Sequence, residues 1–149
     1  MRTIPVPEDF AILVADRNRH VLDLLKRELS MDGYSIQLAK DDREVLENLG
    51  GDAPPDLLVL DLEIPYGGGL KLVEALKVKS PRLPIIIYTL FTEYMQHPSL
   101  RRISGFVEKS ENIDTLKLKV IEVLRKHYPA RFSKREKDLQ KSVTSMSDT

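Results

Sequence analysis

The chain has 149 residues, of which 42% are hydrophobic and 31% charged, enough for one domain with a sizeable core. Its 23 Lys and Arg balance its 23 Asp and Glu, so binding of nucleic acid through the phosphate backbone is not expected. Because it has no Cys, no membrane-length apolar run and no secretory signal, we expect a cytoplasmic protein without disulfides, thiolate sites or membrane contact.

The first part of the chain predicts two strands and a helix between them. Residues 10–15 form a continuous apolar run, which is typical of a strand buried on both faces of a parallel sheet. Apolar residues then recur at helical spacing over 21–29, and Gly33 follows at a position where a helix C-cap favours glycine. Over 34–38 apolar and polar residues alternate, which predicts a half-exposed strand at the edge of the sheet.

A second helix and a second buried strand come next. Asp41 and Glu44 have the spacing of a capping box, ahead of apolar residues at helical spacing over 45–49. Two glycines at 50–51 end that helix, since glycine both permits unusual backbone angles and disfavours a helix interior. Residues 57–60 are all apolar and predict a strand buried on both faces.

The next part of the chain predicts a helix and a strand, followed by a segment without a clear pattern. A third helix is predicted over 70–76 and a further buried strand over 84–89. The segment 90–104 has no clear period, and Pro98 interrupts any helix there or begins a short one. We therefore expect an abbreviated fourth helix, followed by a short strand at 106–107.

Asn112 is placed to cap a last helix over 113–127, which Pro129 ends. The predicted strands and helices alternate five times, which implies parallel strands, right-handed crossovers and helices on both faces of the sheet. An edge-like second strand beside buried first, third and fourth strands favours the doubly wound, flavodoxin-like order 2-1-3-4-5 in an α/β fold.

These patterns divide the chain into three parts. We expect residues 1–9 to be an N-terminal lead and residues 10–128 to form the folded domain. Residues 129–149 are polar and rich in Lys, Arg and Ser, and their basic residues are interleaved with acidic ones. We expect a mobile tail or a linker there rather than a nucleic-acid site.

Four polar residues follow four of the predicted strands. Asp16 follows the first strand, Asp61 the third, Thr89 ends the fourth, and Lys109 follows the fifth. Because the carboxyl ends of parallel strands share one edge, we expect these side chains to converge. Two carboxylates favour a hard cation such as Mg²⁺, and a hydroxyl with an ammonium suits a phosphoryl group. Each residue alone would be an ordinary loop residue, but four at four strand ends indicate a site.

Four segments, 12–16, 55–70, 84–89 and 105–110, resemble the receiver domain of bacterial two-component response regulators, the CheY-like family. The resemblance covers about residues 10–128. It implies a phosphoprotein that works in phosphorelay signal transduction by switching an interaction surface. It implies no enzyme, beyond self-phosphorylation from small donors and autodephosphorylation.

The resemblance also implies roles for individual residues. Asp61 would accept a phosphoryl group from a sensor histidine kinase or a phosphotransfer protein. Thr89 would donate a hydrogen bond to the bound phosphoryl group, and Lys109 would pair with its charge. The implied cofactor is Mg²⁺, held by Asp16, Asp61 and the backbone carbonyl of Glu63.

An aromatic switch is implied at Phe106, while Pro65 and Gly69 match the turn after the phosphorylated strand. We expect Thr89 to move toward a bound phosphoryl group and to vacate space into which Phe106 can turn. A downstream protein or a second copy would then bind the face of the fourth helix, fifth strand and fifth helix. The alternative is that Phe106 is a fixed core residue, since aromatic side chains are usually buried.

The sequence departs from the family at two positions of the implied site. Asp16-Arg17 stands where the family has two adjacent acidic residues, so Mg²⁺ affinity should fall because a guanidinium cannot ligate a cation. Arg17 either pairs with Asp61 or Glu63 in the cation's place or turns out to solvent. The Glu63 carboxylate would restore the missing charge if it entered the pocket. Leu90 is large where the family prefers Ala or Gly and would narrow the entrance.

Two other functions stay open on the sequence. The first is a pseudo-receiver, a phosphorylation-independent interaction module stabilised by Arg17. The second is a flavodoxin-like hydrolase or phosphatase, which the sequence disfavours because it offers no recognisable nucleophile–base pair near Asp61. A zinc site is not expected, because the three histidines are dispersed along the chain.

Overall fold

Five parallel strands form one sheet. The computed structural model describes residues 10–65, 68–110 and 112–132. Its strands are β1 (Ala11–Ala15), β2 (Ser35–Ala39), β3 (Leu57–Leu60), β4 (Ile85–Thr89) and β5 (Gly105–Glu108). Its α-helices are α1 (Arg19–Met31), α2 (Asp42–Leu49), α3 (Gly68–Lys79) and α4 (Ile113–His127), and two short 3-10 helices are η1 (Thr92–Gln96) and η2 (Pro98–Leu100). The order β2-β1-β3-β4-β5 confirms the predicted doubly wound sheet.

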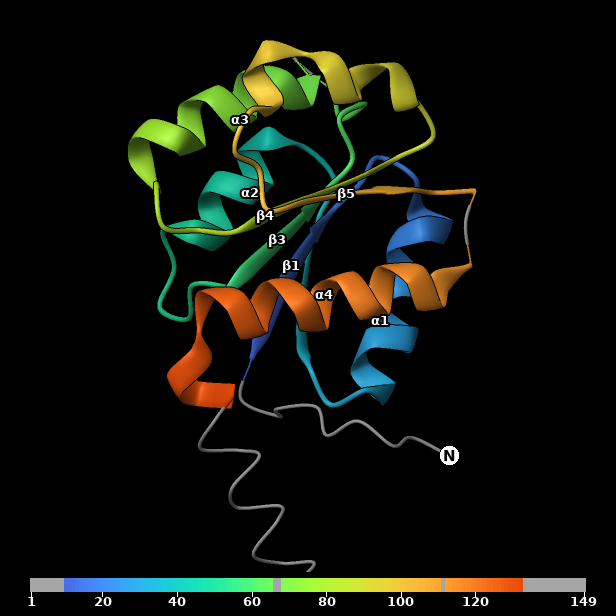
Figure 1. Cartoon of the computed structure of the whole chain (residues 1–149), viewed down its shortest axis with the longest axis vertical. Coiled ribbons are helices and arrows are strands. Elements are labelled where there is room, and N and C mark those ends of the chain that lie inside the picture. Colours follow the sequence, from blue (N-terminus) through green and yellow to red (C-terminus); the bar gives the residue numbers. More distant parts are fainter. Residues whose placement is uncertain (1–9, 66–67, 111, 133–149) are drawn as a thin grey trace, which may run out of the picture.

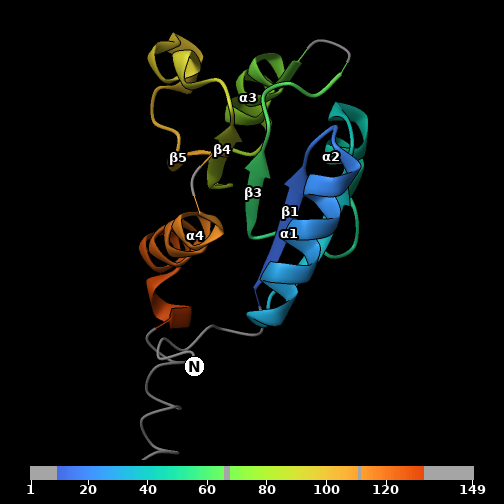
Figure 2. The same cartoon turned by 90° about the vertical axis from the view of Figure 1, so that its right-hand side faces the viewer.

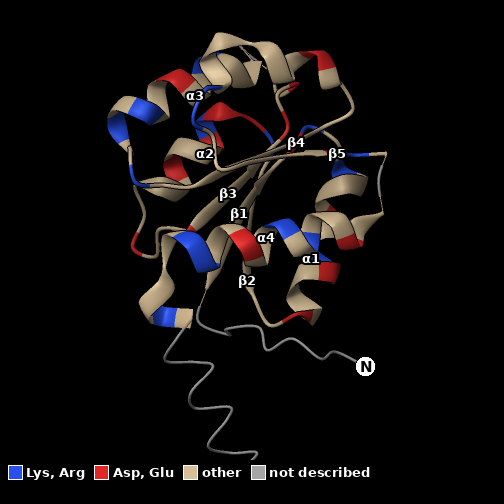
Figure 3. Cartoon of the chain, in the orientation of Figure 1, with Lys and Arg blue, Asp and Glu red and all other residues tan. Residues whose placement is uncertain are grey.

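The sheet separates two apolar cores. Helices α1 and α4 cover one face, and α2, α3 and the two 3-10 helices lie on the other (Figures 1 and 2). Successive residues of a strand point to opposite faces, so in β1 Ile12 and Val14 join the first core while Leu13 and Ala15 join the second. Figure 3 shows the consequence for charge: Lys, Arg, Asp and Glu lie on helices, on loops and, as Glu108, at the end of β5, while β1 and β3 carry none.

Capping residues set the helix ends that the sequence predicts. The Asp41 carboxylate accepts a 2.9 Å hydrogen bond from the Glu44 N–H, and Asn112 accepts one of 2.9 Å from the Asp114 N–H. The reciprocal bond of the predicted capping box is shifted by one residue, because the Glu44 carboxylate accepts from the N–H of Lys40. Gly33 has a φ of 101°, the left-handed region that glycine adopts without a steric penalty.

The connection between β4 and β5 departs from the fivefold strand–helix alternation. The expected abbreviated fourth helix is not an α-helix: η1 and η2 replace it. Pro98 begins η2 and has no N–H to continue a helix from η1, and it restricts the preceding His97 to an extended conformation with ψ of 133°. The face expected from the fourth helix, fifth strand and fifth helix therefore consists of η1, η2, β5 and α4.

The chain packs against the domain beyond the end of α4. At the amino end of the sheet, the Arg131 guanidinium lies 2.8 Å from an Asp56 carboxylate oxygen and 3.9 Å from the centroid of the Phe10 ring. The Tyr128 hydroxyl donates to the Asp56 carbonyl at 2.7 Å. Phe132 is 2% exposed, with its ring centroid 5.3 Å from that of Phe10. These contacts join residues 128–132 to the beginnings of β1 and β3.

This packing bears on the expected domain boundary after residue 128. Residues 129–132 are again helical and include the buried Phe132, so the packed structure continues past Pro129, which ends only α4. The expected N-terminal lead at 1–9 and the tail at 133–149 lie outside the described residues and stay predictions.

The buried contact of Phe132 predicts a large loss of stability on truncation. Phe132→Ala should lower the free energy of unfolding by about 3 kcal/mol, because it removes a buried ring and leaves a cavity beside Phe10. Leu118→Ala, at a 58% exposed position on α4, should change it by less than about 0.5 kcal/mol. Urea unfolding of both variants measures this difference, and equal effects would contradict the packing of the 128–132 segment.

Candidate functional site

The carboxyl ends of β1, β3, β4 and β5 bring the four predicted polar residues to one edge of the sheet. The N–H of Asp61 donates to the carbonyl of Ala15 at 2.9 Å, and the N–H of Lys109 donates to the carbonyl of Thr89 at 2.9 Å. Each bond extends the ladder between neighbouring strands by one residue. The backbone of the sheet therefore sets the spacing of these residues directly.

A buried ammonium bridges two buried carboxylates at this edge. Lys109 Nζ lies 2.6 Å from Asp16 Oδ2 and 3.1 Å from Asp61 Oδ2. The side chains of Asp16 and Asp61 are 2% and 6% exposed, and that of Lys109 is 13% exposed. Two carboxylates buried this closely repel each other unless a cation lies between them, and Lys109 supplies it.

Burial raises the pKa of Asp16 above its usual value of 3.8, and the nearby Asp61 charge acts in the same direction. The hydrogen bond from Lys109 and one from the N–H of Asn18, at 2.8 Å, lower it but do not outweigh the burial. Asn18 is also the N-cap of α1, accepting from the N–H of His20 at 2.9 Å. Asn18 therefore fixes the Asp16 carboxylate through its N–H and the start of α1 through its side chain.

The backbone and the side chain of Glu63 have different partners. Its N–H donates to Asp61 Oδ1 at 3.2 Å, while its carboxylate accepts a 2.7 Å hydrogen bond from the hydroxyl of Tyr94 in η1. Tyr94 was not predicted from the sequence, because it lies 31 residues from Glu63 in the segment without a clear period. The Glu63 carboxylate thus lines the pocket while it is bonded to Tyr94.

The turn after β3 depends on a close approach at Gly69. A Cβ atom there would lie 2.6 Å from the Cα of Leu62, closer than any side chain allows, and the Gly69 N–H donates to the Leu62 carbonyl at 2.8 Å. The start of α3 is thereby packed against the residue that follows Asp61. Pro65, the other residue of the predicted turn, is exposed.

A small pocket of 90 Å³ opens beside the carboxylates, lined by Asp16, Arg17, Asn18, Asp61, Glu63, Leu90, Phe91 and Lys109. Leu90 is 59% exposed at this pocket, as a residue at an entrance would be. Arg17 also lines it, but its side chain is exposed and forms no ion pair with any carboxylate in the described part of the chain. Of the two sequence-based alternatives for Arg17, the structure shows the solvent-facing one.

The oxygen donors at this edge suit Mg²⁺, with one carboxylate fewer than the family provides. Asp16 and Asp61 present carboxylate oxygens within reach of one ammonium, which shows that a single cation can contact both. Within the described residues there is no group of three or more His, Asp or Glu side chains placed to hold a metal. Two carboxylates therefore face a position that one cation can occupy, and no third carboxylate of the described residues is placed to join them.

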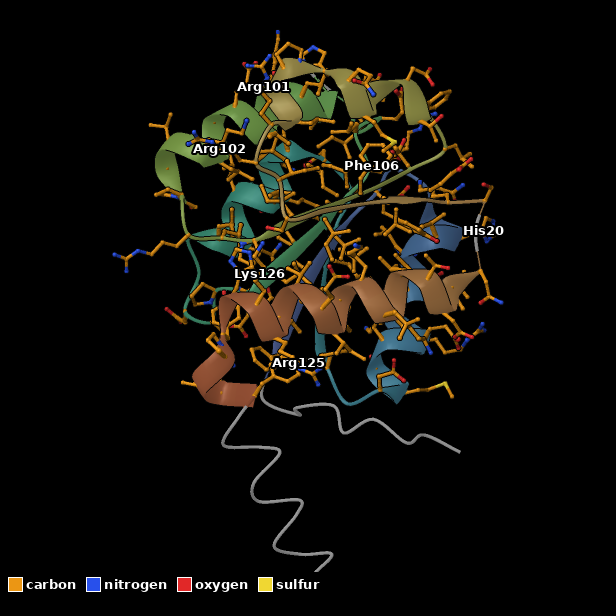
Figure 4. All side chains as sticks on the ribbon, in the orientation of Figure 1. His20, Arg101, Arg102, Phe106, Arg125 and Lys126 are labelled. Carbon is orange, nitrogen blue, oxygen red and sulfur yellow. The ribbon has the colours of Figure 1, made fainter. Side chains whose placement is uncertain are left out.

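Thr89 and Phe106 lie on the two neighbouring strands β4 and β5. Thr89 is fully buried, and its hydroxyl oxygen accepts a 3.2 Å hydrogen bond from the N–H of Phe91. Phe106 pairs with Ile87 in the sheet and is partly buried against the second core, on the side of the 3-10 helices (Figure 4). The ring is neither fully enclosed nor free in solvent, so both a fixed and a switching role stay predictions.

Comparison with known proteins agrees with this fold. The model of the response regulator receiver domain matches residues 12–121. Response regulator MprA of Mycolicibacterium vanbaalenii is 42% identical over 78 residues, covering 52% of this chain and 33% of the relative. The MprA protein of Mycobacterium tuberculosis strain ATCC 25177 / H37Ra gives the same identity, covering 34% of its length. The matched segment is thus about a third of these relatives.

Solved structures show the same arrangement. The response regulator TrrA of Thermotoga maritima, solved in complex with Mg²⁺-BeF, superposes with a TM-score of 0.72 at 34% identity, covering 77% of this chain and 99% of TrrA. The chemotaxis regulator CheY4 of Vibrio cholerae has the same fold, with a TM-score of 0.69 at 24% identity over 77% of this chain and 98% of its own. The chain belongs to the response regulator receiver domains of two-component systems. No helix in its described part has the length and hydropathy that crossing a bilayer requires.

The raised pKa of Asp16 predicts a stability change with a defined pH dependence. An ionised Asp16 is unfavourable in the folded state, so its penalty is present above the folded pKa and absent below the unfolded value of 3.8. Asp16→Asn should therefore raise the melting temperature by a few degrees at pH 7, and the gain should vanish as the pH falls below 3.8. Thermal unfolding without divalent cations checks this, and a variant less stable than wild type at pH 7 would contradict it.

Proposed function

We propose that this receiver domain is a phosphorylation switch in which Asp61 accepts the phosphoryl group. The observation that carries the proposal is the contact of Lys109 Nζ with both Asp61 and Asp16 at the carboxyl edge of the sheet. An Asp61 oxygen attacks phosphorus and forms an acyl phosphate, while the bond from phosphorus to a histidine nitrogen breaks and that nitrogen keeps the electron pair. The donor is a sensor histidine kinase or a phosphotransfer protein, and small donors such as acetyl phosphate can replace it.

The chain's own residues provide positioning and charge for this transfer. The Glu63 N–H, 3.2 Å from Asp61 Oδ1, orients the carboxylate, and Lys109 is placed to pair with the phosphoryl oxygens. The Thr89 hydroxyl already accepts a bond from Phe91, so its proton is available to the phosphoryl group. Phosphoryl transfer is catalysed mainly by such positioning and electrostatic stabilisation.

Mg²⁺ would be held by Asp16, Asp61 and the Glu63 carbonyl. When bound, it neutralises charge on the attacking carboxylate and the incoming phosphoryl group. The complex of the TrrA relative with Mg²⁺-BeF supports this assignment. Arg17 removes one acidic ligand and adds a positive charge at the pocket, so we expect weaker metal binding here than with a second carboxylate.

Output would use the face of η1, η2, β5 and α4. If Thr89 moves toward a bound phosphoryl group, Phe106 on the adjacent strand gains space to turn inward, which gives two packings with different affinities for a partner. The partner is a downstream protein or a second copy of the chain. We place this signalling in the cytoplasm, where its phosphodonors act.

A phosphorylation-independent interaction module is the second candidate. The specific observation in its favour is that Lys109 Nζ lies 2.6 and 3.1 Å from the two carboxylates, so a side chain of the protein itself offsets part of their charge. A hydrolase or phosphatase is not favoured, since no Ser or His lies among the residues that line the pocket in the described part of the chain. Whether Asp61 can be phosphorylated separates the phosphorylation switch from the phosphorylation-independent interaction module.

Asp61 should be the single phosphoacceptor. Incubation with Mg²⁺ and acetyl phosphate should add the mass of one phosphoryl group to the wild-type chain and none to Asp61→Asn, because the amide nitrogen is no nucleophile for this transfer. Intact-mass spectrometry measures this. The second candidate predicts no addition in either protein, and addition that persists in Asp61→Asn would move the acceptor elsewhere.

Arg17 should weaken Mg²⁺ binding. Arg17→Asp should bind Mg²⁺ roughly tenfold more tightly than wild type, equivalent to about 1.4 kcal/mol, because it adds an oxygen ligand and removes a repulsive charge. Arg17→Ala is the matched control that removes the charge without adding a ligand, and its affinity should lie between the two. Calorimetric titration decides this, and equal affinity in all three proteins would exclude Arg17 as a determinant.

A further inference from the structure

Tyr94 contacts two residues that line the pocket beside Asp61. Its hydroxyl donates to Glu63 Oε1 at 2.7 Å, and Glu63 lines the pocket on the side of β3. Its ring meets that of Phe91 edge-on, with centroids 6.4 Å apart, and Phe91 lines the pocket on the side of β4. The Tyr94 side chain therefore links the segment that follows β3 to the segment that follows β4.

The segment that carries Tyr94 has few other attachments. Within η1, whose residues are all described, Tyr94 is half-buried while Thr92, Glu93, Met95 and Gln96 are exposed. No side chain of the described residues caps the start of η1. The Tyr94 ring packs against the second core, so its hydroxyl bond and its ring together hold the segment in place.

Phe91, which lines the pocket, is held by a hydrogen bond to Thr89 that the proposed movement of Thr89 would weaken. Leu90 and Phe91 are 59% and 40% exposed, and the Phe91 N–H is bonded to the Thr89 hydroxyl at 3.2 Å. When Thr89 turns toward a phosphoryl group, this bond weakens. The Tyr94–Glu63 contact then remains as the side-chain tether between η1 and the turn after β3.

The contact is a hydrogen bond to a charged acceptor. The bond to Glu63 raises the pKa of Tyr94, with smaller contributions in the same direction from burial and from the charges of Glu63, Glu93 and Asp61. The phenol therefore stays protonated and able to donate at neutral pH. Hydrogen bonds to charged groups are the stronger class in proteins.

We propose that Tyr94 is a positioning residue that latches η1 to Glu63 and so restricts access of phosphodonor and water to Asp61. The inference rests on the proposed function and adds a regulator of its rates. Loss of the phosphoryl group occurs when water attacks phosphorus, the bond to the Asp61 oxygen breaks, and inorganic phosphate leaves as the carboxylate re-forms. A latch that narrows the same entrance slows both this hydrolysis and phosphorylation by a small donor.

The experiment compares wild type with Tyr94→Phe, which keeps the ring and removes only the hydroxyl. Phosphorylation by acetyl phosphate with Mg²⁺, and decay after removal of the donor, are both followed by intact mass. In parallel, hydrogen exchange is measured without donor at the amides of Phe91, Tyr94 and His97, which are hydrogen-bonded in the latched segment. Tyr94→Phe should accelerate phosphorylation, decay and exchange by about three- to tenfold, the range that loss of one hydrogen bond allows.

Three further variants separate the latch from a general loosening of the structure. Glu63→Ala removes the acceptor and should reproduce the faster exchange, while Glu63→Gln keeps an uncharged acceptor oxygen and should give exchange between that of wild type and that of Glu63→Ala. In the double variant Tyr94→Phe/Glu63→Ala the exchange should be no faster than in either single variant, because both remove one bond. Met95→Ala, an exposed position on η1, should match wild type in all measurements.

The outcomes distinguish the latch from the proposed function. If wild type is phosphorylated but Tyr94→Phe leaves rates and exchange unchanged, the latch is overturned and the proposed function stands. Faster exchange with unchanged phosphorylation and decay overturns the gating role. If neither protein is phosphorylated, the proposed function falls together with the kinetic role, and the exchange measurements alone decide whether Tyr94 holds η1.

Discussion

The position of one ammonium group between two buried carboxylates governs this site. Asp16 and Asp61 end neighbouring strands, so the sheet forces their charges together in a region with little solvent. Such a pair is unfavourable without a cation, because each carboxylate loses hydration and repels the other. Lys109 follows β5, which is separated from β3 by β4, and its Nζ lies within 3.1 Å of an oxygen of each carboxylate. The three strand ends are therefore linked by electrostatics as well as by the backbone ladder.

The buried charges are connected to the surface by a series of side-chain contacts. A phosphoryl group or a divalent cation bound at this edge would alter the charge that Lys109 balances. Thr89 connects to Phe91 through a hydrogen bond, and Phe91 contacts Tyr94 through its ring. This chain of contacts leads from the buried charges to η1 on the surface, where few attachments resist movement.

Packing at the two ends of the sheet is unequal. At the amino end, Asp56 is bonded to Ala11, Tyr128 and Arg131, and Phe132 is enclosed beside Phe10. At the carboxyl end, the connection from β4 to β5 consists of two short 3-10 helices in place of an α-helix. The mostly exposed η1 segment therefore lies at the end of the sheet that carries the charged residues, opposite the packed 128–132 segment.

The sequence alone determined the features that depend on near neighbours in the chain. Apolar runs set the strands, Asp41 and Asn112 set helix starts, and the polar residues at strand ends followed from the parallel order, because each is a local preference repeated along the chain. The tertiary structure decided the orientation of Arg17 toward solvent and the Tyr94–Glu63 bond. Both features depend on how loops without a regular period fold back on the sheet. No local sequence pattern encodes that folding, because it brings together residues that are distant in sequence.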